Sequence, residues 1–530
     1  MNEQINTTPQ IGKDVIESLT LGMYEDCRFI YREYIQNAAD AVDKAIECNL
    51  LKKGEEAIHV RIDKDNRSIS VQDNATGIPQ EKVMAILRNI AHSTKKRGED
   101  KGFRGIGRLG GLGYCSKLIF ETSYYGESVK SIMTWDADLL KYIINDREDK
   151  EEATEVLAKV TKLETKDENI DAHYFNVIME DVSLDDLLDV ESVSDYLSMV
   201  APVDISSRFI FRQKINDFKK ENGLVVDTYN IFVNDDQIYK PYTSVIYDEG
   251  NGGKKKVDDI VDVKFLLEKD DNGSIIYWGW YSISTLRGQM KPLNLARGIR
   301  LRKENIQIGD EEICKKFFTK TEDQRFSFYY FGEIHAISKG LIPNSRRDYF
   351  AESKECVDFE QKIREDFLKL KDLCYDAQKL RSSTSTIIKT EELRATIHSK
   401  EKNGYTSQKE RDDLHHRLEE QEKKEEQAQK QLAKVKDKIS SKDSPLKSVL
   451  NKFETSIPTK EQPKEDSEQV TSDKVKEAKT RYRTDKPIYS RYSKSEKKLI
   501  GKIYTAISNA IADERLREAL ISNIEEQITK

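Results

Sequence analysis

The sequence is poor in cysteine and lacks the common metal-binding patterns. It has 6 cysteines in 530 residues, none of them in a CxxC pair, which is too few for a disulfide scaffold of this length. We expect reduced structural thiols. The 7 histidines form no HExxH motif, so a metal site built from Cys or His is not expected. No segment approaches the roughly 18 consecutive apolar residues that a membrane helix needs, and residues 1–12 are too polar for a signal peptide. We expect a soluble, cytoplasmic protein.

Charge is what the sequence has in excess. Lys and Arg number 88 against 95 Asp and Glu, which gives a net charge of −7, and charged residues make up 35 % of the chain. A globular chain typically has about 25 % charged residues. The length suggests roughly three to four domains. Because of this excess of charge, part of the chain should be solvated helix or linker.

The N-terminal two-thirds has the pattern of a mixed α/β protein. Helical periodicity runs over 14–50, a second helix is expected from Gln80 to about Ala91, and the charged stretch His92–Gly102 is expected to be a loop. The expected strands are 57–63, 68–73, 114–125, 174–179, 229–233, 275–284 and 326–337.

From about Phe359 the pattern is helical without strands. Residues 414–439 carry a heptad seam that is polar in its middle, which fits a coiled coil or an intramolecular helical pair equally well. Residues 455–490 are rich in Lys, Glu, Ser and Pro, as expected of a linker. Apolar spacing returns near the end, and we expect a helical hairpin over 491–530.

The first candidate site motif lies on the predicted helix FIYREYIQNAADAVDKA. At about 100° per residue, Glu33, Asn37, Asp40 and Ala41 fall on one face, whereas Ile30, Tyr34, Ala38 and Ala45 form an apolar face that should pack on a sheet. A carboxylate and a carboxamide four residues apart are ordinary on a surface helix. This helix therefore indicates a site only in combination with motifs farther along the chain.

The second motif, DNATGIP, comes directly after the strand that ends near Val71. Asp73 at the strand end can accept a hydrogen bond from an exocyclic amine, and Gly77 lets a flat base lie close to the backbone. By itself this is also a common turn.

The third motif is GFRGIGRLGGLG at 102–113, with six glycines in twelve positions. Such a loop exposes backbone N–H groups to phosphate. It contains GxGxxG, but a charged loop precedes it where a dinucleotide fold has an apolar strand, and Arg108 and Leu109 stand where a P-loop has Lys and Ser or Thr. The surrounding residues therefore match neither the dinucleotide-binding motif nor the P-loop.

In order and spacing, the three motifs together resemble the ATP-binding domain shared by DNA gyrase, heat-shock protein 90, histidine kinases and MutL, the GHKL superfamily. NLARGIRLRKENIQIGD at 294–310 and EIHAISKGLIPNSRRDYF at 333–350 resemble the middle, transducer domain of heat-shock-protein-90-like and MORC-like bacterial ATPases. The resemblance covers about 10–350. It implies an α+β fold with a Bergerat-type ATP-binding α/β sandwich at 10–215, an α/β transducer-type domain at 216–358 and a helical, possibly coiled-coil region at 359–454.

The resemblance implies roles for individual residues. Glu33 would act as general base, Asn37 would ligate Mg²⁺, and Asp73 would bind the adenine amino group beside Gly77. A basic residue of the transducer domain would sense the γ-phosphate. The candidates are Arg346, with Arg347 its neighbour, and Lys303. The remaining implied ATP contacts are Asp40, Ala41, Lys95 of the lid, Gly102, Phe103, Arg104, Gly105, Ile106 and Gly107.

The sequence departs from the family pattern at two points. Ala75 replaces the first glycine of DxGxG, which is tolerable if its φ angle is negative. The strand expected to close the pocket with Gly-Thr reads HYFNVIMED and contains no threonine. The corresponding contact is left unassigned.

The function implied is that of a slow Mg²⁺-dependent ATP hydrolase that works as an ATP-gated homodimeric clamp on a protein or DNA partner. A basic stretch at 474–498 with three tyrosines could contact nucleic acid, so a MutL- or MORC-like DNA-associated clamp is the alternative. A histidine kinase is a further class, but the ATP domain begins near residue 10 and leaves no room for a phospho-acceptor helix before it. His415 and His416 lie far downstream.

Overall fold

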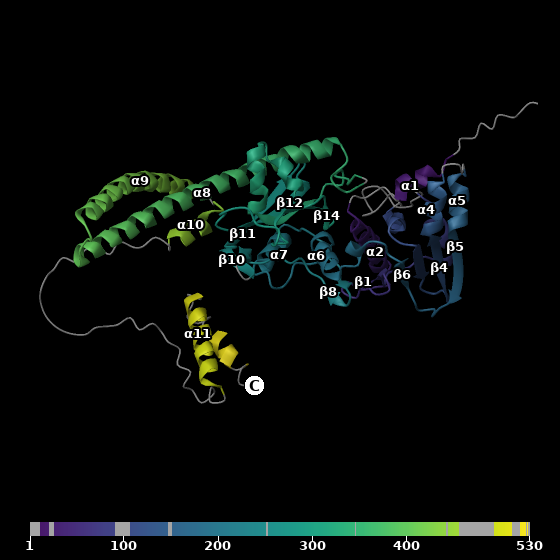
Figure 1. The fold of residues 1–530 in the computed structure, drawn as a ribbon. Coiled ribbons are helices and arrows are strands. Elements are labelled where there is room, and N and C mark those ends of the chain that lie inside the picture. Colours follow the sequence, from purple (N-terminus) through teal and green to yellow (C-terminus); the bar gives the residue numbers. More distant parts are fainter. Residues whose placement is uncertain are drawn as a thin grey trace, which may run out of the picture. The chain divides into compact units, whose positions relative to one another are not determined.

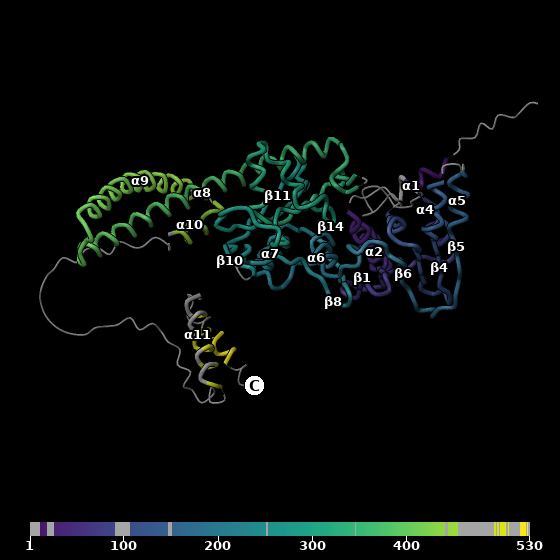
Figure 2. Tube along the Cα trace, in the orientation of Figure 1, coloured from purple at the N-terminus to yellow at the C-terminus, as the bar shows by residue number. Residues whose placement is uncertain are grey.

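A computed structural model describes residues 11–20, 26–90, 107–146, 151–250, 253–344, 346–440, 444–454, 492–510, 520–525 and 527. The chain divides into two units, Met1–Pro458 and Thr459–Lys530, and each is taken by itself (Figures 1 and 2). Over the described residues, no helix combines the length and the apolar character needed to span a bilayer.

The first lobe of the larger unit is built on a single eight-stranded sheet in the order β5-β4-β3-β6-β2-β1-β7-β8. Neighbouring strands are antiparallel except β1 and β7, which run parallel. The sheet continues to Gln237, past residue 215 where the sequence places the end of this domain. The strands are β1 (Ile58–Asp63), β2 (Ser68–Asp73), β3 (Lys117–Ser123), β4 (Val129–Asp136), β5 (Thr161–Asp167), β6 (Tyr174–Glu180), β7 (Ile231–Val233) and β8 (Asp236–Gln237).

One face of this sheet is covered by helices, which bury the lobe's core against it. The apolar face predicted for the second helix is confirmed, because Ile30, Tyr34, Ala38 and Ala45 are all buried. The helices are α1 (Asp14–Thr20), α2 (Phe29–Glu47), α3 (Gln80–Leu87), α4 (Ala137–Asn145), α5 (Ala153–Val160) and α6 (Val190–Val200), with 3-10 turns at Gly107–Gly113 (η1) and Asp185–Leu187 (η2). The next helix, α7 (Arg212–Glu221), buries Ile215 in the aromatic core of the lobe that follows.

The second lobe is built on a five-stranded sheet in the order β11-β12-β15-β13-β14, with a separate β9-β10 hairpin. The strand predicted over 326–337 is partly wrong, because its first residues belong to a 3-10 helix and the strand starts at Phe331. A short aromatic segment can be buried equally well as a 3-10 helix or as a strand, so hydrophobic periodicity alone cannot distinguish the two. The elements are β9 (Val245–Gly250), β10 (Gly253–Asp259), β11 (Asp262–Lys269), β12 (Ile275–Ile283), β13 (Gly298–Lys303), β14 (Ile306–Ile308), β15 (Phe331–Ala336), η3 (Ile313–Phe317) and η4 (Thr321–Tyr329).

A helical region comes next, made of α8 (Lys354–Asn403), α9 (Gln408–Ser440) and α10 (Lys447–Glu454). The heptad seam of α9 packs inside its own chain, since Leu432, Val435 and Ile439 share a buried core with α8. The polar middle of the seam is also satisfied internally, because the Arg394 guanidinium of α8 lies 2.7 Å from the Glu425 carboxylate. Of the two alternatives for the seam, the structure shows the intramolecular pair.

The smaller unit contains α11 (Lys494–Ala510) and a further helical stretch at 520–525. Tyr504 and Ile521 are buried between them. The segment predicted as a linker lies outside the described residues.

Candidate functional site

Helix α2 carries the first group of predicted site residues on one face. The Glu33 side chain is 14 % exposed and the Asp40 residue 5 %, while Asn37 and Ala41 are half-buried. Tyr31 and Tyr34 anchor the helix: the Tyr31 hydroxyl donates to the Leu187 carbonyl at 2.5 Å, and the Tyr34 hydroxyl accepts from the Gly111 N–H of the glycine-rich turn at 3.1 Å. The functional face is thereby held toward the glycine-rich turn.

Glu33 lies against the start of that turn. A Cβ atom placed on Gly107 would come within 2.3 Å of the Glu33 Oε2, so no side chain fits there while the carboxylate keeps its position. The Glu33 carboxylate and the backbone of the glycine-rich turn are thus in close contact. Lys95 and the predicted phosphate contacts at 102–106 lie outside the described residues.

Two arginines flank the Glu33 carboxylate. Its Oε1 atom lies 3.7 Å from the Arg32 guanidinium and 3.6 Å from the Nε of Arg347, which comes from the second lobe. Burial lowers the pKa of Arg347 and the nearby Arg32 lowers it further, whereas Glu33 and Asp40 raise it. A buried cation from the second lobe therefore faces the Glu33 carboxylate, and Asp40 of the same helix also acts on it.

The structure separates the three basic residues considered from the sequence. Arg347, with φ +55°, is the one directed to Glu33; its carbonyl accepts from the Gly309 N–H at 2.8 Å. The neighbouring Arg346 lines a different cavity, although its carbonyl accepts from Arg32 at 3.2 Å. The Lys303 ammonium donates to the Ser338 carbonyl at 2.8 Å, within the second lobe. Sequence reasoning had placed Arg347 only as a neighbour.

Asp73 ends β2 as predicted and is 3 % exposed. Burial raises the pKa of its carboxyl to about 7, although the N–H groups of Ala75 and Phe175 oppose the shift. The Ala75 N–H lies 3.0 Å from the Asp73 Oδ1. The φ angle of Ala75 is not positive, so alanine is accommodated where the family has glycine. A buried carboxyl that can accept further hydrogen bonds is suited to read an amine of a bound base.

Gly77 has φ +65°, and a Cβ there would come within 1.9 Å of the Ser123 carbonyl oxygen. The turn is fixed by Thr122, whose hydroxyl accepts from the Ile78 N–H at 2.9 Å and donates to the Tyr174 carbonyl at 3.0 Å. Asp73, Phe175 and Thr122 face one another across β2, β6 and β3. A threonine thus stands in this row one strand away from the position that the sequence suggested.

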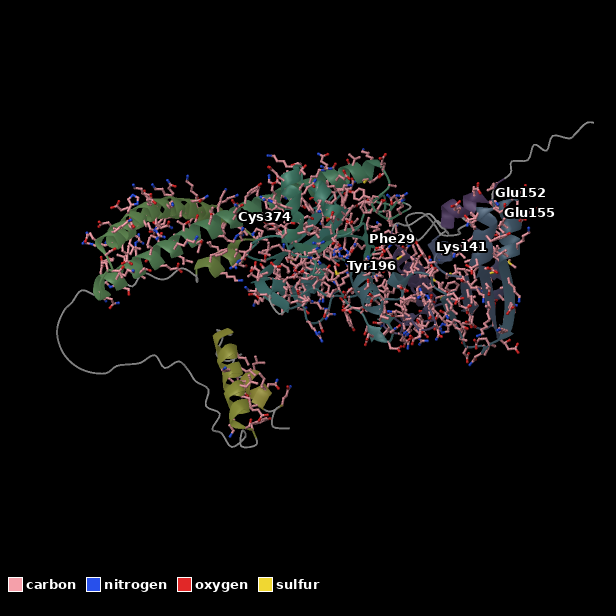
Figure 3. The ribbon with its side chains drawn as sticks, in the orientation of Figure 1. Phe29, Lys141, Glu152, Glu155, Tyr196 and Cys374 are labelled. Carbon is pink, nitrogen blue, oxygen red and sulfur yellow. The ribbon has the colours of Figure 1, made fainter. Side chains whose placement is uncertain are left out.

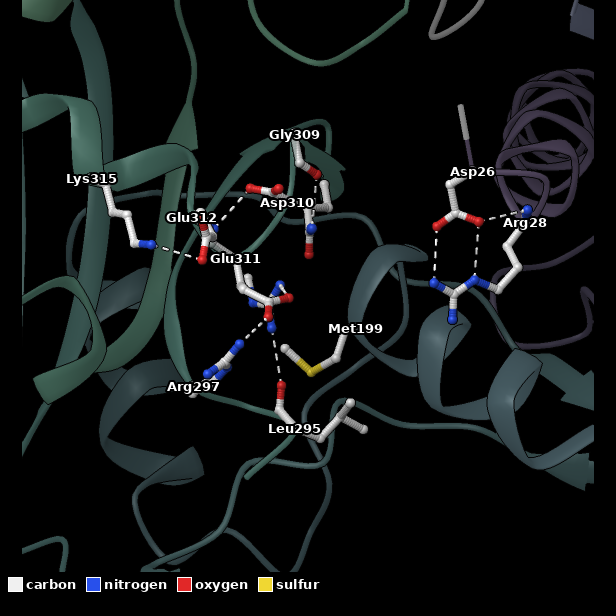
Figure 4. A network of polar contacts seen from close by, with 12 residues as sticks. Asp26, Arg28, Met199, Leu295, Arg297, Gly309, Asp310, Glu311, Glu312 and Lys315 are labelled. Atoms are coloured by element: carbon white, nitrogen blue, oxygen red, sulfur yellow. Dashed lines mark hydrogen bonds and ion pairs between the residues drawn. The ribbon is translucent and has the colours of Figure 1, made fainter. Parts of the chain in front are cut away.

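A cavity of about 810 Å³ lies where the two lobes meet. Figure 3 shows Phe29 and Tyr196 near this junction. Figure 4 shows polar groups that hold its walls: Asp26 pairs with Arg28 at 2.9 Å, and Glu311 pairs with Arg297 at 2.7 Å. Each wall therefore contains an ion pair formed within its own lobe.

The lobes are also joined by a buried polar network. The Arg302 guanidinium lies 2.5 Å from the Glu333 carboxylate and donates to the Met199 carbonyl of α6 at 2.7 Å. Lys240 and His335 complete the cluster around Glu333, at 2.8 and 3.0 Å. Removing Arg302 alone would leave the buried Glu333 carboxylate without its closest cation, which costs roughly 3–5 kcal/mol. The network therefore fixes the base of the second sheet to the end of α6.

Among the described residues no group of three or more His, Cys, Asp or Glu side chains is arranged to hold a metal ion. Mg²⁺ does not need such a group, because it is commonly held by one or two protein oxygens together with phosphates and water. The Asn37 carboxamide offers such an oxygen.

Comparison with known families defines the class of domain. Residues 27–168 match the family described as histidine kinase-, DNA gyrase B- and HSP90-like ATPase. This segment holds α2, β1 and β2, and it is a GHKL-type ATPase domain.

Among characterised proteins the chain is similar to the chaperone protein HtpG of several bacteria. It is 28 % identical over 169 residues to that of Buchnera aphidicola, covering 28 % of this chain and 27 % of the relative. It is 29 % identical over 176 residues to that of Shouchella clausii, covering 31 % and 28 %. The chain thus spans only about a quarter of the length of these relatives.

Proposed function

We propose that this protein binds ATP with Mg²⁺ and hydrolyses it slowly, and that it acts as an ATP-gated homodimeric clamp on a protein or DNA partner. The carrying observation is the meeting of Glu33 with Arg347 at 3.6 Å, because it joins the ATPase domain to a cation from the next lobe. The GHKL-type match over residues 27–168 supports ATP as the ligand.

In this proposal Glu33 orients the attacking water and takes its proton, while Asp73 accepts a hydrogen bond from the adenine amino group. Asn37 would supply an oxygen to Mg²⁺, which neutralises charge on the phosphoryl oxygens when it is bound. Arg347 is placed to exchange its contact with Glu33 for the γ-phosphate, so that the second lobe detects the triphosphate. Arg347 thus takes the role that the sequence offered first to Arg346.

The clamp is supported by the same geometry. Arg347 belongs to the second lobe, so this lobe would move when Arg347 leaves Glu33 for a phosphate. The position of the lobe would then depend on which nucleotide is bound. Because the α9 seam is buried against α8, we place self-association of two chains elsewhere than on that seam. The partner is a protein or DNA, and the proposal requires only that ATP closes the clamp around it.

The test is Glu33→Ala, compared with Glu47→Ala at the exposed end of the same helix. We expect Glu33→Ala to bind ATP with unchanged affinity and to lose hydrolysis, whereas Glu47→Ala keeps both. Turnover is measured by phosphate release and binding by calorimetry. Undiminished turnover in Glu33→Ala would sink the catalytic assignment.

The partner can be found with the same variant. Glu33→Ala loaded with ATP should stay closed, so the bound material can be recovered and identified. A salt-resistant complex with DNA favours the DNA clamp, and recovery of one protein that ADP releases favours remodelling of a protein. Mass spectrometry of the isolated complex reports the number of chains, and a monomer in the ATP-trapped state would contradict the clamp.

A further inference from the structure

A cavity distant in sequence from the ATP motifs lies between α8, α10 and the connection after β12. Its volume is about 420 Å³, within the range of small-ligand sites. The lining residues are Arg287, Arg381, Thr384, Ser385, Ile388, Lys389, Glu392 and Phe453. All of them belong to the larger unit.

Positive charge predominates in this cavity. Three cations, Arg287, Arg381 and Lys389, face one carboxylate, that of Glu392. Across the part of the chain that the structure describes, none of the three cations forms an ion pair. Burial lowers the pKa of Arg381, and the like charge of Arg287 acts in the same direction. Two guanidinium groups and an ammonium group against a single carboxylate in the lining favour an anion.

Contacts outside the cavity hold the backbone next to Arg287 and the carboxylate of Asp258. Leu286 is buried with φ +51°, a conformation that fixes the direction in which the chain presents Arg287. The Thr285 carbonyl accepts from Arg381 at 2.6 Å. Asp258 is engaged by the Thr285 hydroxyl at 2.5 Å and by Lys452 at 3.5 Å. This carboxylate is therefore engaged by two side chains that do not line the cavity.

A buried hydroxyl in the wall lacks a partner within the described ranges. Thr384 is 3 % exposed, and its Oγ1 atom has no hydrogen-bond partner among the residues that the structure describes. Leaving such a buried group without a hydrogen-bond partner is unfavourable, and a ligand oxygen would relieve it. Beside it, the exposed Ser385 offers a second hydroxyl. Hydroxyl and guanidinium donors together match the oxygens of a phosphoryl group.

The remaining wall is apolar. The half-buried side chains of Ile388 and Phe453 line it, and the volume of about 420 Å³ is far more than a bare phosphate occupies. Aromatic rings are the usual platforms on which nucleobases stack.

We propose that this cavity binds a phosphate ester carrying a planar base, with the phosphate on Arg287, Arg381 and Lys389 and the base against Ile388 and Phe453. The ester is either a free nucleotide or one unit of a nucleic-acid strand, since both present the same chemistry. The site is separate from Asp73 and Glu33, and it does not depend on ATP hydrolysis.

The test uses the full chain and thymidine 5′-monophosphate, which lacks the exocyclic amine that Asp73 would read. Calorimetry should detect binding that weakens about tenfold or more in the variant Arg287→Glu/Lys389→Glu. The matched control is Lys402→Glu/Arg411→Glu, which reverses two exposed cations of α8 and α9 outside the cavity and should bind as the wild type does. Thermal unfolding verifies that both variants fold.

Two further measurements define the ligand. Phe453→Leu should weaken the nucleotide and leave inorganic phosphate unchanged, because only the base contacts the ring. Short oligothymidylate is then compared with the mononucleotide. If it binds more tightly, and Arg287→Glu/Lys389→Glu weakens its binding as well, the natural ligand is a nucleic-acid strand. If the two affinities are equal, the ligand is a free nucleotide. Absence of binding at millimolar nucleotide, or equal affinity in the cavity and control variants, would overturn the proposal.

Discussion

The buried carboxyl of Asp73 makes stability depend on pH in a direction opposite to that of a salt-bridged acid. Burial raises its pKa to about 7. The ordinary value is about 3.9, and three units correspond to about 4 kcal/mol. Between these two values the folded protein holds a proton that the unfolded chain has released. The free energy of unfolding therefore falls as the pH rises from about 4 to about 7 and levels off above that.

Asp73→Asn removes this dependence and keeps an oxygen that can accept from Ala75. The wild type loses about 1–2 kcal/mol through ionisation of Asp73 at pH 5 and about 4 kcal/mol at pH 8, so the advantage of the variant should grow by about 2–3 kcal/mol between these conditions. Urea unfolding of the nucleotide-free protein measures it. Asp65→Asn, on the exposed turn between β1 and β2, serves as control and should show no such growth.

Ligand affinity provides an independent measure of the same carboxyl. If the ionised form accepts from the adenine amine, a pKa near 7 means that about 9 % of Asp73 is competent at pH 6 and about 91 % at pH 8. Uncharged adenosine should therefore bind about tenfold more tightly at pH 8. An Asp73→Asn advantage that is equal at pH 5 and pH 8, with adenosine affinity independent of pH, would refute the reasoning.

Three further predictions concern the lobe contact, the Gly77 turn and the helical pair. Arg347→Ala should lower the turnover of ATP about tenfold or more with little change in ATP affinity, whereas Arg346→Ala should stay within about twofold; equal losses in steady-state assays would remove the distinction. Gly77→Ala should lower the unfolding free energy by about 3 kcal/mol because of its φ and the Ser123 contact, while Gly126→Ala, with φ +89° but open space, should lose only about 1 kcal/mol; thermal unfolding compares them. Leu432→Asp should separate α9 from α8 and speed amide exchange along α9 while the chain keeps its oligomeric mass, and a change of that mass with unchanged exchange would instead place the seam between chains.

The features predicted from the sequence are those set by near neighbours. Glu33, Asn37 and Asp40 share a face because helical geometry repeats every 3.6 residues, and Asp73 ends its strand because the alternation stops there. Arg347 meets Glu33 across 314 positions, and its left-handed backbone decides that it, rather than Arg346, turns inward. No local pattern encodes that choice. The α9 seam was ambiguous for a related reason, since a heptad specifies that a partner exists but not which chain supplies it.

The length of α8 has a mechanical consequence for the contact at Glu33. The helix begins only seven residues after Arg347 and continues for 50 residues, about 75 Å at 1.5 Å per residue. Its first half shares the core of the second lobe, so the two move as one piece. A tilt of about 5° at Arg347 carries the far end of α8 through about 6 Å, roughly one helical turn. In the proposed clamp, an ångström-scale exchange of partners at Glu33 would therefore become a displacement several times larger at the far end of α8.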